Sequence, residues 1–300
     1  MLINAMKGCE GSKSVGAVDL QKVDRYRSLE TRAKLYDLVR SLRTRGMSYG
    51  RIQETVSASL ESPISKGSIS QWVRGIHKPL GRVNEFNQTA TVELAYVIGV
   101  VLSDGNVNSR KYDREVLLSV TDREYAEEFR RCLGRVVGGF SKVRRSEKRN
   151  RWIVQKRSIL LYQFLRRPWS GFKPFIEHDT KCTCAFLRAF YDGEGSISGR
   201  SLTLYNTKLD ILTYIRDLLG KLKIETTELR VGTRAGTELK DPLNGRIYTR
   251  NSDCFSLRIR AKNLPQFARD VGFTITRKQQ KLEEALISAK KPMTHFAPSA

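Results

Sequence analysis

The sequence predicts an α+β protein in which the order α-β-β-α-β-β-α occurs twice, after a small all-α domain. Three observations carry this prediction. A helical stretch that begins near Leu94 is repeated 90 residues later near Cys184. The same order of strand-like and helical segments follows each copy. The region before the first copy shows only helical periodicity.

The chain is expected to divide into six segments. These are a flexible amino-terminal segment at 1–24, an all-α domain at 25–82, a first repeat at 83–168, a linker at 169–181, a second repeat at 182–290 and a tail at 291–300.

Residues 25–82 predict three short helices. Ser48 and Ser65 are typical N-caps for the second and third of these, and Gly75 lies near the end of the third. The apolar stripes expected to point inward are Leu35, Leu38, Val39 and Leu42; Ile52, Val56 and Leu60; and Ile69, Trp72, Val73 and Ile76.

The third helix is expected to expose Lys66, Gln71 and Arg74. Three short helices with such a polar outer face resemble a helix-turn-helix module, in which the last helix lies in the DNA major groove. A generic three-helix packing domain is the alternative, because the apolar stripes explain only the core.

Small residues recur at a spacing of four in both copies of the repeated stretch, which places them on one helical face. They are Ala95, Gly99 and Ser103 in the first copy and Ala185, Ala189 and Gly193 in the second. Such stripes let two helix backbones approach closely. We expect the helices to pack in parallel about a pseudo-twofold axis, so that Asp104 and Glu194 emerge at the same end.

Two ordinary buried helices are the alternative interpretation of this pair. However, Gly99 inside a helix costs about 1 kcal/mol relative to Ala. An acid at the negative end of the helix dipole is also unfavourable unless it holds a cation.

Basic residues alternate with apolar ones in the strand-like segments of both repeats. Those expected to contact DNA are Lys142, Arg144, Arg145, Arg149, Arg151 and Arg157 in the first repeat and Arg230, Arg234, Lys240, Arg246, Arg250, Arg258 and Arg260 in the second. A sheet with helices on one face and Arg and Lys on the other is typical of a surface that binds duplex phosphates. A merely solvated charge run is the alternative.

Composition also points to a polyanionic partner, because the formal charge is +23 and the pI is near 10.1. An anionic membrane surface would attract such a chain too, but the charges are not gathered in one amphipathic stretch. Five cysteines without a C-x-x-C pair and three scattered histidines indicate neither a disulfide framework nor a zinc site. We expect an intracellular monomer without a membrane segment, cytoplasmic or nucleoid-associated in a prokaryote.

The stretches VIGVVLSDG at 97–105 and LRAFYDGEG at 187–195 resemble the paired motifs of the monomeric LAGLIDADG homing endonucleases. The resemblance extends over about residues 92–290. It implies two halves whose antiparallel sheets form a saddle over DNA. It also implies a Mg²⁺ or Mn²⁺ site at Asp104 and Glu194, with the following Gly105 and Gly195.

The resemblance implies further site residues. Asp122 and Asn206 match polar positions beside the metals, and Lys181 and Lys278 are candidates for a basic residue near the cleavage centre. Asp192 matches an earlier acidic position that supports the helix interface, so we assign it no metal role.

Site-specific hydrolysis of double-stranded DNA is therefore the leading expectation. A DNA-binding regulator of the LAGLIDADG and helix-turn-helix type that no longer cuts is one alternative. An intron maturase that binds structured RNA is another.

Overall fold

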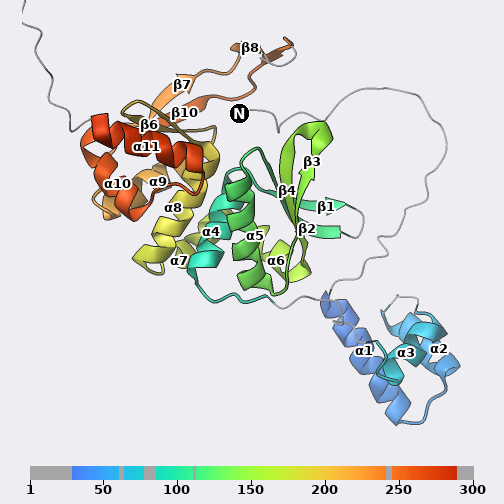
Figure 1. Cartoon of the computed structure of the whole chain (residues 1–300). Helices are drawn as coiled ribbons and strands as arrows, with labels where there is room; N and C mark the ends of the chain where they lie inside the picture. The colour runs from blue at the N-terminus through green and yellow to red at the C-terminus, as the bar shows by residue number, and fades with distance from the viewer. Residues whose placement is uncertain (1–28, 61–63, 78–85, 111–112, 241–244, 289–300) are drawn as a thin grey trace, which may run out of the picture. The chain divides into compact units, whose positions relative to one another are not determined.

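A computed structural model of the chain describes residues 29–60, 64–77, 86–110, 113–240 and 245–288 (Figure 1). The chain divides into two compact units, Met1–Arg82 and Val83–Ala300. The segment 1–24 and the tail 291–300, both singled out in the sequence, lie outside the described residues. None of the helices in the described part has the length and apolar character needed to cross a membrane.

Unit 1 contains the three expected helices, α1 (Leu29–Thr44), α2 (Tyr49–Leu60) and α3 (Lys66–Val73). The Ser65 hydroxyl accepts the backbone N–H of Ser68 at 3.1 Å, which caps α3 as expected. The buried apolar residues from all three helices and their connection form one core: Leu35, Val39, Leu42, Ile52, Val56, Ile64, Ile69 and Trp72.

One inward position expected in unit 1 is wrong. Ile76 is 61% exposed, because α3 ends at Val73 and Gly75 then turns the chain with a φ of +70°. The side chain of Leu60 lies outside the described set.

Unit 2 contains the duplicated order of elements. The first half comprises α4 (Val92–Leu102), β1 (Asn106–Arg110), β2 (Asp113–Val120), α5 (Arg123–Val137), β3 (Val143–Ser146), η1 (Glu147–Arg149), β4 (Arg151–Arg157) and α6 (Ile159–Leu165). The second comprises α8 (Thr180–Glu194), β5 (Gly195–Ser198), β6 (Ser201–Asn206), α9 (Leu209–Lys221), β7 (Arg230–Thr233), β8 (Glu238–Lys240), β9 (Ile247–Thr249), β10 (Cys254–Ile259), η3 (Ala261–Asn263), α10 (Leu264–Asp270) and α11 (Thr276–Ser288). The predicted linker 169–181 holds η2 (Trp169–Phe172), α7 (Lys173–Ile176) and the start of α8.

Each half of unit 2 builds one antiparallel four-stranded sheet. The strand orders are β1-β2-β4-β3 and β5-β6-β10-β7, so the two sheets have equivalent topologies. The second sheet carries an additional two-stranded arm, β8 and β9. This arrangement confirms the predicted fold class of two repeated α+β halves.

Helices α4 and α8 lie side by side at the centre of unit 2, between the two sheets (Figure 1). Both are apolar on most sides, and nearly all their residues are buried, as expected for helices at the centre of a core. One continuous apolar cluster joins them to the sheets and to α5, α6, α9, α10 and α11. The two halves therefore share one core.

Candidate active site

The small residues of α4 and α8 meet in register. A Cβ atom on Gly99 would lie 2.6 Å from the Phe186 carbonyl oxygen and 2.8 Å from the Ala189 Cβ. Farther along both helices, a Cβ on Gly193 would lie 2.7 Å from the Ser103 hydroxyl oxygen. Gly99 faces Ala189, and Ser103 faces Gly193, so both helices run in the same direction. Residues 90 positions apart therefore lie opposite each other.

The remaining predicted interface residues are also buried. Ala95 has no exposed surface and Ala185 is 7% exposed. The Tyr125 hydroxyl of α5 donates to the Ala189 carbonyl at 3.0 Å, next to the crossing point. Close backbone approach at this interface requires the small side chains.

Parallel packing brings the two acids to the same helix end. Helix α4 stops at Leu102, so Asp104 lies just past its end, whereas α8 continues to Glu194. An Asp104 carboxylate oxygen lies only 3.2 Å from where a Cβ of Gly193 would be. Gly105 and Gly195 then allow the chain to fold closely over the last turn, where a side chain would collide with Val100 or Tyr191.

The two carboxylates share an unfavourable environment. Burial and, to a smaller extent, the charge of Asp104 together raise the pKa of Glu194 to about 7. Burial also raises the pKa of Asp104, while Lys278 and Arg151 act to lower it. Two carboxylates in such a setting favour a bound cation, which reverses the mutual repulsion.

Asn206 and Asp122, which occupy equivalent positions in the two halves, have different partners. The Asn206 amide donates to Glu194 Oε1 at 3.3 Å, so it lies directly at the acids. Asp122 instead accepts two bonds from Arg277 of α11, at 2.6 and 2.8 Å. Burial acts to raise the pKa of Asp122, but the bonds from Arg277 outweigh it and the net shift is downward.

The structure separates the two candidate lysines. Lys278 of α11 is 3% exposed, and its Nζ donates to the carbonyls of Tyr191 and Asp192 in the last turn of α8, at 3.2 and 2.5 Å. Burial lowers the pKa of Lys278 to about 8, against the opposing charge of Asp192. Lys181 is exposed in the first turn of α8, about 20 Å from Glu194 at 1.5 Å per residue, so it does not reach the acids.

Asp192 joins the end of α8 to the segment that precedes α11. Its carboxylate accepts the backbone N–H groups of Thr274 and Ile275, with distances of 3.0 to 3.2 Å. The residue is 1% exposed, and burial raises its pKa to about 6. Its carboxylate therefore binds protein backbone, and the assignment of no metal role to Asp192 stays a prediction.

Strand register decides which basic residues face away from the helices. On β4, buried Val154 pairs with buried Leu118, so Arg151, Ile153, Gln155 and Arg157 point to the opposite, open face. Arg144 pairs with Ile153 and shares that face. Arg151 also donates to the Ser119 carbonyl at 3.0 Å, and its charge acts to lower the pKa of Asp104.

The second sheet has an equivalent open face. Leu257 and Ile259 of β10 are buried, so Arg258, opposite Thr203, points outward. Arg230 pairs with Ser256 and shares this face. The other predicted basic residues lie outside the two four-stranded sheets: Lys142 just before β3, Arg149 in η1, and Arg234, Lys240, Arg246 and Arg250 along or beside β8 and β9.

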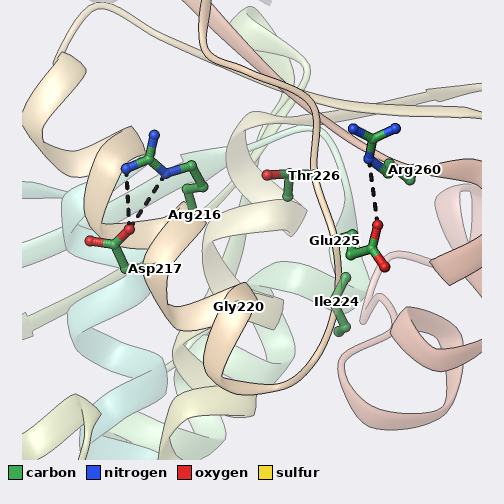
Figure 2. A pocket seen from close by; sticks show the side chains of 7 residues that line it. All are labelled: Arg216, Asp217, Gly220, Ile224, Glu225, Thr226 and Arg260. Atoms are coloured by element: carbon green, nitrogen blue, oxygen red, sulfur yellow. Dashed lines mark hydrogen bonds and ion pairs between the residues drawn. The ribbon is translucent and has the colours of Figure 1, made fainter.

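Two predicted DNA contacts face elsewhere. Arg145 pairs with Trp152 on the helix side of the first sheet, where its guanidinium lies 5.7 Å from the indole centroid. Arg260 lies 3.6 Å from Glu225 and lines a pocket of about 510 Å³ with Arg216 of α9 (Figure 2). Side chains alternate between the two faces along β3, which puts Arg145 on the helix side, and β10 ends at Ile259, just before Arg260.

In unit 1, the exposed surface of α3 carries Lys66, Gln71 and Arg74, as predicted from the sequence. Ile69 and Trp72 occupy the opposite, buried side.

The chain belongs to the family of LAGLIDADG-like domains, which matches residues 91–165 and 181–272. An uncharacterized protein of Methanocaldococcus jannaschii is 29% identical over 91% of this chain and 99% of its own length. The homing endonuclease I-DmoI, solved in complex with DNA and Mn, is 15% identical, with a TM-score of 0.45 over 61% of this chain and 97% of its own. Full-length WhiA of Thermatoga maritima is 15% identical, with a TM-score of 0.41 over 69% of this chain and 64% of its own.

Proposed function

We propose that unit 2 hydrolyses phosphodiester bonds of double-stranded DNA at specific sites. The observation that carries this proposal is the meeting of Asp104 and Glu194, one from each repeat, at the ends of two parallel helices. The basic open faces of the two sheets belong to the same unit and offer contacts to phosphates on either half of a target. Membership of the LAGLIDADG-like family supports the same assignment.

The donor set of the candidate site fits a hard cation. Asp104 and Glu194 supply carboxylate oxygens, which are the ligands that Mg²⁺ and Mn²⁺ prefer. When bound, such an ion supplies an activated water and stabilises charge on the phosphate. The upward pKa shifts of both acids favour the same conclusion, because an ion would offset the cost of two buried charges.

The chain's own residues have separate roles in this proposal. Lys278 holds the last carbonyls of α8 and so positions Glu194, while its charge acts on Asp104. Asn206 orients the Glu194 carboxylate. Arg151 lies on the open face and its charge acts on Asp104, so in this proposal it neutralises the scissile phosphate.

Cleaved sequences selected from a random duplex library with Mg²⁺ would provide the substrate for a direct test. Asp104→Asn and Glu194→Gln should each abolish cutting while binding of the same duplex changes little. Asp217→Asn, which alters an exposed acid of α9, is the matched control and should cut normally. Cutting that persists in both site variants would refute the catalytic assignment.

Binding without cutting is the second candidate function, and unit 1 is the observation that favours it. The polar outer side of α3 fits a recognition helix in the major groove. If wild-type protein protects a duplex without cutting it, and the full chain with Gln71→Ala and Arg74→Ala binds more weakly, the regulator is the correct function. Preference for structured RNA over duplex DNA would instead support the maturase.

A further inference from the structure

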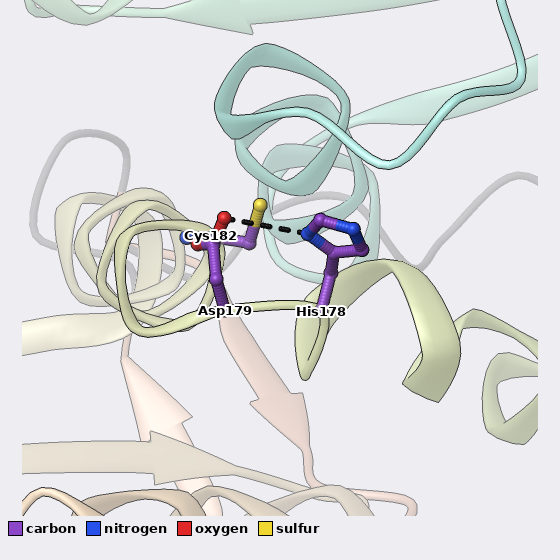
Figure 3. Close-up of side chains that lie close together, drawn as sticks. All are labelled: His178, Asp179 and Cys182. Atoms are coloured by element: carbon purple, nitrogen blue, oxygen red, sulfur yellow. Dashed lines mark hydrogen bonds and ion pairs between the residues drawn. The ribbon is translucent and has the colours of Figure 1, made fainter.

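A second group of ligand-type side chains lies at the start of α8, at the opposite end of the helix from Glu194 (Figure 3). His178 and Asp179 directly precede the helix, and Cys182 lies in its first turn. Each offers one ligand atom, and the three atoms all lie within 4.8 Å of one another. The sequence, in which the histidines are scattered, did not indicate this group.

The start of the helix explains why the three side chains converge. Asp179 is the N-cap of α8, and its Oδ1 accepts the backbone N–H of Cys182 at 2.7 Å. Its other oxygen, Oδ2, lies 3.3 Å from His178 Nδ1. Cys182 is 1% exposed, and Figure 3 shows its sulfur beside the carboxylate and the imidazole. The cap thus holds the thiol and the imidazole near one carboxylate.

We propose that His178, Asp179 and Cys182 bind a zinc-class divalent ion, with water as the fourth ligand. An imidazole nitrogen, a carboxylate oxygen and a thiolate sulfur are all ordinary zinc ligands, and three protein ligands leave one open position. Asp104 and Glu194, at the other end of α8, supply only oxygen ligands. The chain would then carry two cation sites of different chemical preference on one helix.

The spacing of the donors suits a tetrahedral ion. Metal to ligand distances of about 2.0–2.3 Å place tetrahedral ligands about 3.3–3.8 Å apart. His178 Nδ1 and Asp179 Oδ2 are already 3.3 Å apart, and no two of the three donor atoms are more than 4.8 Å apart, so only small adjustments would bring all three to one ion.

An ion in this position would tie residues before α8 to its first turn. The Thr183 hydroxyl already donates to the Ile176 carbonyl at 2.9 Å, which joins the end of α7 to the same turn. Metal binding would add a second restraint there. Metal binding would therefore stabilise the start of α8, whether or not the protein cleaves DNA.

Titration of the metal-free full chain with Co²⁺ tests this proposal, because a thiolate bound to Co²⁺ gives a near-ultraviolet charge-transfer band that an oxygen-only site cannot produce. We expect the band to saturate at one ion per chain, to be displaced by Zn²⁺ and to resist excess Mg²⁺. His178→Ala should weaken Co²⁺ binding about tenfold or more, and Cys182→Ser should remove the band.

Two other cysteines supply matched controls. Cys184→Ser alters a buried cysteine two residues farther along α8, and Cys9→Ser alters one outside the described residues; both variants should keep the band. The proposal is overturned if wild-type protein gives no thiolate band, or if the band survives unchanged in His178→Ala. His178 is exposed, so that variant tests the site without disturbing the core.

Discussion

Four acidic residues around the end of α8 differ mainly in their partners. Asp192 accepts backbone N–H groups, Asp122 is bound by Arg277, and Glu194 is contacted by the amide of Asn206. Asp104 and Glu194, to which we assign the cation in the proposed function, form no salt bridge with a basic side chain among the described residues. At this scale, the contacts rather than the residue type assign each role.

The raised pKa of Glu194 predicts a pH-dependent stability. Its folded value of about 7 lies above its ordinary value of 4.5, so the neutral form stabilises the fold fully below pH 4.5, and this contribution is lost as pH rises through 7. Without divalent cations, wild-type stability should therefore fall over this range by up to about 3 kcal/mol more than that of Glu194→Gln. Denaturant unfolding with chelator at several pH values measures this difference.

Added Mg²⁺ should restore part of the wild-type stability above pH 7, but not that of Glu194→Gln. Glu238→Gln, an exposed glutamate of β8, is the control and should follow wild type. Identical pH dependence in wild type and Glu194→Gln would show that burial of this carboxyl is not unfavourable.

At the scale of elements, the contact between α4 and α8 tolerates no added atom at Gly99. A methyl group there would collide with the Phe186 backbone, which cannot move as a flexible side chain could. Gly99→Ala should destabilise the protein by about 1–3 kcal/mol despite the better helix propensity of Ala. Thermal or denaturant unfolding measures the change.

Gly220 in α9 provides the matched substitution in open space, since no atom lies within 4 Å of its would-be Cβ. Gly220→Ala should stabilise the protein by up to about 1 kcal/mol. If both substitutions change stability in the same direction and to the same extent, close helix approach does not limit residue 99.

Helix α11 lies outside the residues that match the family, yet it supplies Lys278 and Arg277 to the site. Asp192 holds the chain just before it. Asp192→Asn should therefore loosen α11, because the amide lacks the charge and replaces Oδ2, which accepts the Thr274 N–H, with a donor NH₂ group. Hydrogen exchange in residues 276–288 should become about tenfold to a hundredfold faster, as expected for loss of about 1.5–3 kcal/mol.

Asp217→Asn, in α9, is the control for this exchange experiment and should leave α11 unchanged. Unaltered exchange of α11 in Asp192→Asn would mean that other contacts hold the helix in place.

For the whole molecule, the charge of +23 predicts DNA binding that weakens strongly as salt concentration rises. Each phosphate contact contributes about one to the slope of log affinity against log salt concentration. Arg144→Ala and Arg258→Ala, on the open faces, should each lower this slope by about one. Arg145→Ala and Arg260→Ala remove equal charge from other surfaces and should change it much less. Equal effects of all four substitutions would favour a diffuse charge effect over sheet contacts.

Local periodicity predicted the elements well where each has its own apolar stripe. The three helices expected within 25–82 are present, and Ser65 caps the third as predicted. Side-chain direction in the strands was harder to predict, because one step of register moves a residue to the other face. Arg145 was misplaced for this reason, Arg260 because β10 ends one residue before it, and Lys181 because a motif alone does not give the distance along a helix.

The sequence by itself determined the duplication, the small-residue stripes and the two acids in register, since all of these are local patterns repeated at a constant interval. Only the tertiary structure decided which groups surround the acids. Asp122 and Arg277 are 155 positions apart, and the donors to Asp192 come from 82 and 83 positions away. Contacts over such separations depend on how whole helices and strands pack against one another. The pattern of residues within either segment therefore cannot predict them.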